Sequence, residues 1–75
     1  MHVGKEIRRV MTKRGHSVSW LASCLHTVRG NVYDIFERES VDTQLLARIS
    51  VLLHFNFFLL LSDEVEKDIE ESVSS

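Results

Sequence analysis

Hydrophobic residues recur at helical spacing along most of the chain. The first stripe predicts an amphipathic helix whose inward positions are Val3, Ile7, Val10 and Met11. Gly15, one residue after Arg14, is placed to end this helix in a left-handed conformation. The spacing therefore predicts the first of several short helices packed around one core.

Two more short helices are predicted between residues 17 and 36. Ser17 is a suitable N-cap for the first, whose apolar positions are Val18, Leu21, Ala22 and Leu25. Thr27 is placed to cap the second, whose apolar positions are Val28, Val32, Ile35 and Phe36. Only residues 25–28 separate the two helices. Two short helices joined by so tight a turn are typical of a helix-turn-helix, in which a small residue such as Ala22 permits close crossing.

The segment from residue 40 onward predicts a fourth helix and a second, more ambiguous element. Ser40 and Asp42 offer N-caps, and the stripe that follows is Leu45, Leu46, Ile49, Leu52 and Leu53. Residues 55–61 are almost wholly apolar. Periodicity alone leaves a short buried helix and an edge strand open there, and the four preceding helices favour a helix.

The chain turns acidic after Ser62. Val65, Ile69 and Val73 repeat every four residues among the acids, which is consistent with a packing helix or with a frayed, disordered tail. We therefore expect an all-α, compact bundle of four to five helices. Residues 1–61 would form the domain, and residues 62–75 an acidic C-terminal tail.

Charge is divided unevenly between the two halves of this 75-residue chain. Its net charge of −2 comprises about +4 over residues 1–38 and −6 over residues 39–75. A basic half beside an acidic one suggests a face that binds a polyanion. The longest apolar run, 51–61, is broken by His54 and Asn56 and is too short to span a membrane. Without a signal-peptide pattern, the expectation is a cytoplasmic protein.

The segment from Ser17 to Glu37 resembles the helix-turn-helix family of phage repressors and Cro proteins (XRE type). It is closest in pattern to small predicted transcriptional regulators from Bacteroides, which carry a tryptophan in the second helix. The motif Arg29-x-Asn31-x-Tyr33-x-Ile-Phe and the segment Ser40-Val-Asp-Thr-Gln-Leu-Leu46 carry the resemblance, which covers roughly residues 3–61. It implies a lambda-repressor-like bundle whose third helix lies in the DNA major groove. Val18, His26 and Gly30 depart from the family pattern.

The resemblance implies a DNA-contacting set on the third helix and around the second. Base contacts are expected from Arg29, Gly30, Asn31 and Tyr33. Phosphate contacts are expected from Lys13, Ser17, Val18, Thr27 and Arg38. The chemistry fits, because arginine pairs with guanine O6 and N7 and asparagine pairs with adenine N6 and N7. The function expected is therefore sequence-specific binding of double-stranded DNA by a transcriptional regulator that represses by occupying its operator.

Three residues allow two interpretations each. Asp34 either accepts from a cytosine amine or pairs with Arg38 four residues away, and we favour the pairing. Gly30 either lets the backbone of the predicted helix after Thr27 approach DNA closely or is neutral drift. Trp20 faces away from the second helix's apolar stripe, and we interpret it as packing over a helix corner rather than as a ligand platform.

Enzymatic and metal-dependent functions find little support. No nucleophile elbow or phosphate-binding glycine loop occurs, so neither a catalytic residue nor a small-molecule substrate is expected. His16, Cys24 and His26 are metal ligands by type, but no local pair has zinc-site spacing, and a lone cysteine excludes an internal disulfide. We expect no metal and no cofactor.

The apolar load of residues 55–61 exceeds what one short buried helix needs. Exposed apolar patches mark interfaces, so a homodimer is expected through Phe55, Phe57, Phe58 and Leu60. The alternative function is a protein-interaction module, such as an antitoxin or accessory factor, that uses the same segment without binding DNA. A further hypothesis is autoinhibition, in which residues 62–75 fold back over the basic face.

Overall fold

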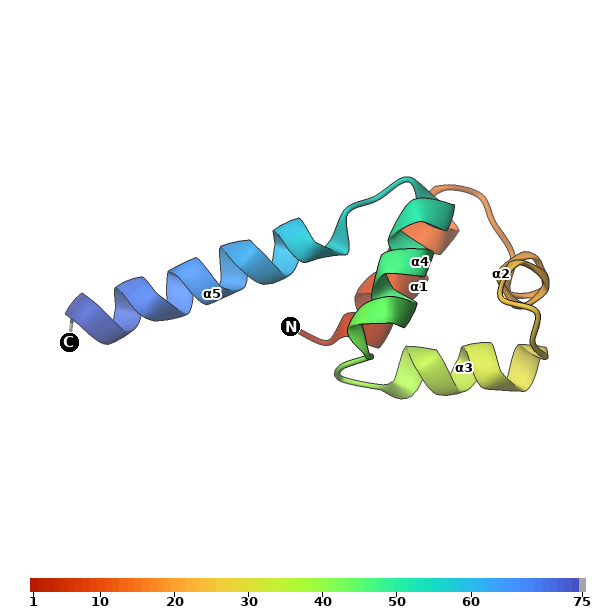
Figure 1. Ribbon diagram of the computed structural model, residues 1–75, viewed down its shortest axis with the longest axis horizontal. Helices are drawn as coiled ribbons and strands as arrows, with labels where there is room; N and C mark the ends of the chain where they lie inside the picture. Colours follow the sequence, from red (N-terminus) through yellow and green to blue (C-terminus); the bar gives the residue numbers. More distant parts are fainter. Residues whose placement is uncertain (75) are drawn as a thin grey trace.

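Five α-helices and no strand make up residues 1–74, which the computed structural model describes (Figure 1). In chain order they are α1 (Val3–Lys13), α2 (Val18–Cys24), α3 (Arg29–Glu37), α4 (Thr43–Leu53) and α5 (Phe57–Ser74). The all-helical class predicted from the spacing is therefore confirmed for these residues. The edge-strand alternative for residues 55–61 is wrong, because α5 begins at Phe57 and continues without a break.

Side-chain caps start most of the helices. The hydroxyl of Ser17 accepts a 3.0 Å bond from the Trp20 amide, and the carboxylate of Asp42 accepts a 2.8 Å bond from the Leu45 amide. The predictions for Ser17 and Asp42 are thus confirmed, whereas Ser40, the other candidate for α4, lies two residues before the N-cap and does not cap the helix. Thr27 does not cap α3, because the helix begins one residue later than expected and Val28 occupies the N-cap position without a side-chain bond.

Three residues with positive φ end helices or turn the chain between them. Gly15 has φ of +80°, which confirms its predicted left-handed conformation. The other two are histidines, His26 after α2 with φ of +55° and His54 after α4 with φ of +52°. A residue with a Cβ adopts this conformation at a cost, so both histidines occupy positions that glycine fits best.

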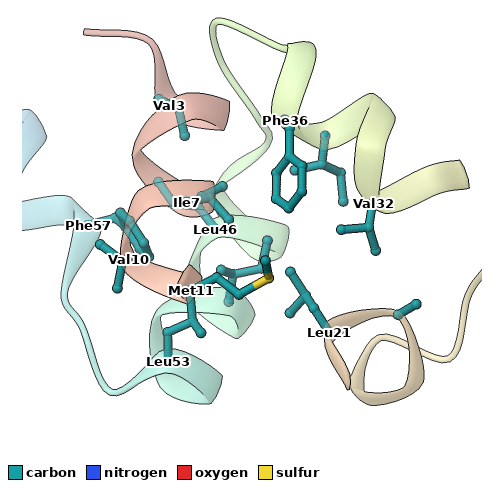
Figure 2. Packing of buried hydrophobic residues seen from close by; sticks show 13 residues of the cluster. Val3, Ile7, Val10, Met11, Leu21, Val32, Phe36, Leu46, Leu53 and Phe57 are labelled. Carbon is teal, nitrogen blue, oxygen red and sulfur yellow. The ribbon is translucent and has the colours of Figure 1, made fainter. Parts of the chain in front are cut away.

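The buried core draws side chains from all five helices (Figure 2). It contains Val3, Ile7, Val10, Met11, Leu21, Ala22, Val32, Ile35, Phe36, Leu46, Ile49, Leu53 and Phe57. Most of the predicted stripe positions are among them, whereas Val18, Leu25, Leu45 and Leu52 are only half-buried against the core. Two residues depart further from the prediction. Val28 is mostly exposed, because the N-cap position takes it out of the helical register of α3. Phe57 is fully buried and closes the core from the start of α5.

Helix α1 approaches the end of α3 closely. The amides of Val3 and Gly4 donate to the carbonyls of Glu39 and Arg38 at 3.0 and 2.9 Å. A Cβ added at Gly4 would collide with the backbone carbonyls of Ile35 and Phe36. A residue without a side chain is therefore required where the two helices meet.

Helix α5 projects away from the other four helices (Figure 1), and the molecule measures 46 × 21 × 20 Å. Near the middle of α5, Glu64 accepts a 2.6 Å bond from the α-ammonium of Met1, and this bond raises the pKa of that ammonium. The acidic segment continues the same helix to Ser74, while Ser75 lies outside the described residues. The acidic segment of α5 points away from α3 and does not fold back over that helix (Figure 1).

Candidate nucleic-acid interface

Helices α2 and α3 are consecutive short helices joined by a four-residue turn. In Figure 1 α2 is seen nearly end-on while α3 lies across the view, so the two cross steeply. The amide of Thr27 donates to the Ala22 carbonyl at 2.9 Å, and His26 supplies the left-handed residue of the turn. Ala22 and Val32 are both buried, so a small side chain does lie where these helices pack.

Helix α3 has one buried face and one solvent face. Val32, Ile35 and Phe36 point into the core. Every residue predicted to contact bases is exposed: Arg29, Gly30, Asn31 and Tyr33. At about 100° per residue, Arg29 and Tyr33 share one edge of this face, whereas Asn31 lies on the opposite edge. The predicted set is therefore brought together on one helix but divided between its two edges.

The Arg29 edge presents a cation and a phenol to solvent. Within residues 1–74, Arg29 makes no hydrogen bond or ion pair. Tyr33 is 48% exposed, and its ring meets that of Phe36 edge-on with centroids 6.1 Å apart. The guanidinium of Arg8 lies 5.4 Å from the centre of the Phe36 ring. This cation–π contact brings Arg8 of α1 toward α3, which helical spacing alone did not indicate.

The Asn31 edge lines an open pocket of about 330 Å³ between α3 and α4. The side-chain amide of Asn31 donates a 2.6 Å bond to the Thr27 hydroxyl. Asp34 and Arg38 line the same pocket, but no ion pair joins them among the described residues. The predicted pairing is wrong, because α3 ends at Glu37 and Arg38 has the extended conformation of a C-cap instead of completing a helical turn.

The start of α2 is the second place where phosphate contacts are predicted. Ser17 is exposed, and although its oxygen accepts from the Trp20 amide, its hydroxyl hydrogen can still be donated. Val18 is half-buried against the core, so only its backbone is available for a phosphate. Trp20 packs against the core and stacks on His16, with ring centroids 3.7 Å apart. The interpretation of Trp20 as a packing residue agrees with this contact.

Several cations of the basic half have partners within the chain. Arg9 pairs with Glu6 at 2.8 Å, and Arg14 donates to the His54 carbonyl at 3.0 Å. The middle of the exposed face of α3 carries Asp34 and Glu37. The positive charge of α3 therefore rests on Arg29 alone, and the other exposed cations of the basic half, Lys13 among them, lie mainly along α1. A polyanion would meet repulsion at the C-terminal half of α3.

The predicted dimer segment is only partly exposed. Phe55, Phe58 and Leu60 are half-buried, so part of each ring or side chain remains on the surface. The prediction that Phe57 lies at a dimer interface is wrong, because the core surrounds its side chain completely. The most exposed apolar side chain of the segment is Leu59, which the apolar run did not single out.

Other kinds of site receive no support from residues 1–74. No group of three or more histidine, cysteine or acidic side chains converges there to hold a metal ion. Cys24 is a free, half-buried thiol, and the His16 ring is stacked on Trp20. None of the described helices combines the length and apolar character needed to cross a membrane.

Comparison of the chain with protein-family models, with curated proteins and with solved structures returned no match. The resemblance to phage repressors therefore remains a prediction from the motif. What is established is an all-helical chain in which a short helix pair presents the polar face of α3 to solvent.

Proposed function

We propose that the chain is a repressor-like helix-turn-helix regulator that binds double-stranded DNA sequence-specifically, with α3 as its recognition helix. The observation that carries the proposal is the exposed first turn of α3, where Arg29 has no partner among residues 1–74 and Tyr33 stands beside it. An unpaired arginine on an exposed helix edge is free to bond with guanine O6 and N7. The protein would act in the cytoplasm, at the nucleoid, by occupying an operator.

The interface we propose is centred on the N-terminal half of α3. Arg29 and Tyr33 would face one side of the major groove, with Gly30 letting the backbone come close. Val28 adds an exposed apolar side chain beside Arg29, suited to a thymine methyl group. The acids Asp34 and Glu37 would keep the C-terminal half of α3 away from the phosphates.

Phosphate contacts would surround this central region. Ser17 and the first amides of α2 form a helix N-terminus, which favours anions. Thr27 and Lys13 lie on the turn before α3 and at the end of α1, and Arg38 lies just after α3. A homodimer of this chain would present two α3 helices to successive major grooves, about 34 Å apart.

The experiment that tests this proposal is selection of bound duplexes from a random pool, read by fluorescence anisotropy and sequencing at about 50 and 200 mM salt. We expect an enriched palindrome and a steep loss of affinity at the higher salt. Arg29→Ala should cost about 1–3 kcal/mol on the enriched site and much less on random DNA. Lys5→Ala removes an exposed charge of α1 that takes part in no ion pair within residues 1–74, and it serves as the matched control.

A protein-interaction module is the second candidate. It is favoured by the exposed apolar side chains on α5, Leu59, Val65, Ile69 and Val73. Weak binding to DNA with no enriched sequence would reject the regulator and support this candidate. Equal losses for Arg29→Ala on enriched and random DNA would instead make Arg29 a phosphate contact.

A further inference from the structure

An exposed apolar stripe runs along α5. Phe58, Val65, Ile69 and Val73 are spaced by seven, four and four residues, so they share one face of the helix. Val65, Ile69 and Val73 are 54, 56 and 81% exposed. On α5, Phe57, Leu60 and Leu61 pack against the body from another side of the helix, and Phe58, at the start of the stripe, is itself half-buried against the core. The stripe is therefore an apolar surface that the single chain leaves uncovered.

An apolar groove lies at the other end of the same face. It measures about 490 Å³ and is lined by Ala47 and Val51 of α4, by Phe55, and by Phe58 of α5. Val51 is 73% exposed. Because Phe58 belongs to both the groove and the stripe, the two form one continuous apolar surface extending from α4 along α5.

The charges beside the stripe and the groove are opposite. Residues 63–71 of α5 include six acids and one lysine, and Glu66 and Glu70 border the stripe. On the other side of Phe55, a second open pocket of about 350 Å³ is lined by Arg9, Lys13 and Arg14. The stripe therefore has acidic flanks, whereas the groove has a basic margin.

We propose that a second copy of this chain covers this surface by a reciprocal exchange of α5. The stripe of each copy would lie in the groove of the other, with its acids beside Arg9 and Lys13 of the partner copy. A two-fold axis between the copies produces this arrangement, because it makes the contact between stripe and groove twice, once in each direction. An antiparallel, offset arrangement also separates the two acidic segments, which would repel each other if they lay side by side.

The length of α5 suits this exchange. Its 18 residues extend about 27 Å, which is enough to carry the stripe beyond the other four helices of its own chain and onto a second copy. Two such contacts cover Val51, Val65, Ile69 and Val73 on each copy, all otherwise exposed. The arrangement specifies the interface of the proposed dimer but does not depend on DNA binding, so either proposal can fail alone.

The first test is the mass of the full chain in solution, by sedimentation equilibrium over a range of concentrations. We expect a dimer for the natural sequence and a monomer for Ile69→Asp, with helical circular dichroism unchanged because Ile69 lies outside the core. Leu59→Asp, which changes an exposed leucine of α5 off the stripe, is the matched control and should remain dimeric. A monomeric natural chain, or a dimer that survives Ile69→Asp, would overturn the proposal.

A charge exchange tests which surfaces meet. One variant carries Glu66→Lys and Glu70→Lys on α5, and the other carries Arg9→Glu and Lys13→Glu on α1. In a dimer of either variant with itself, like charges on α5 and α1 would face each other, so each variant alone should be monomeric. In a mixture of the two variants, opposite charges face each other at both contacts, so a heterodimer should form. Failure of the mixture to form a heterodimer while both variants remain helical would reject the contact between α5 and α1.

Discussion

The side-chain amide of Asn31 donates a 2.6 Å hydrogen bond to the hydroxyl of Thr27, across the first turn of α3. Asparagine has two amide hydrogens and a carbonyl oxygen, so this bond uses only one of its groups. The other hydrogen and the oxygen remain available for adenine N7 and N6. Thr27 thus acts on Asn31 as a positioning residue and holds the amide in one orientation.

If Asn31 reads a base, Thr27→Val should weaken recognition of that DNA position. The substitution keeps the shape of the side chain but removes the acceptor, so the amide loses its fixed orientation. We expect a loss of about 1 kcal/mol, or about fivefold, on the enriched site in excess of the loss on random DNA, which measures the phosphate contact proposed for Thr27, both by competition binding. Thr27→Ser retains the hydroxyl and should bind like the natural chain. Equal binding by the valine variant would remove Thr27 from recognition.

Gly30→Ala separates stability from binding at the proposed interface. A Cβ at this exposed position meets nothing within 4 Å, so no contact within the chain requires glycine there. We expect alanine to stabilise α3 by about 1 kcal/mol in urea unfolding, because it restricts the unfolded backbone. If the α3 backbone approaches DNA closely, the same variant binds its site more weakly. A variant that is more stable and binds unchanged would place Gly30 outside the interface.

His26→Gly should stabilise the chain through the backbone of the turn between α2 and α3. His26 has φ of +55°, a conformation that costs an L-residue about 1–2 kcal/mol and costs glycine little. We expect a gain of about 0.5–1 kcal/mol in the free energy of unfolding, after the entropy of glycine is included. His26→Ala is the control, because it removes the imidazole and keeps the strain. A gain of the same size with alanine would assign the effect to the side chain instead.

The sequence predicts those features that depend on local chemistry. Apolar spacing identified the inward residues of α1, α2 and α4, since a helix repeats every 3.6 residues wherever it occurs. Ser17 and Asp42 were recognisable because a cap bonds an amide only three residues ahead. Gly15 was recognisable because only glycine adopts a left-handed conformation without cost.

The features that the sequence did not predict depend on contacts between distant residues. The burial of Phe57 follows from the way α5 packs against α4, so the apolar run alone could not separate Phe57 from Leu59. The two left-handed histidines have no local signal, since histidine is common in other conformations. The predicted base-contacting residues do share the exposed face of α3, but their contact with DNA stays a prediction. Their division between two edges follows from the helical repeat of about 100° per residue and was already implicit in their spacing.

Gly4 provides the test of how closely α1 packs on α3. Its amide donates to the Arg38 carbonyl at 2.9 Å, and any Cβ there would press on the carbonyls of Ile35 and Phe36. Backbone cannot rotate aside as a side chain can, so Gly4→Ala should move α1 away from α3. We expect a loss of about 1–3 kcal/mol in the free energy of unfolding, measured with urea.

The matched control for Gly4→Ala is Gly30→Ala, the same substitution in a helix with open space around it. The two should change the stability of the chain in opposite directions, although helix propensity alone would predict a gain for both. A stabilised Gly4→Ala variant would mean that the interhelical gap widens at no cost. In that case the two amide bonds to Arg38 and Glu39 would not fix the end of α3, and the orientation of its exposed face would depend on α2 instead.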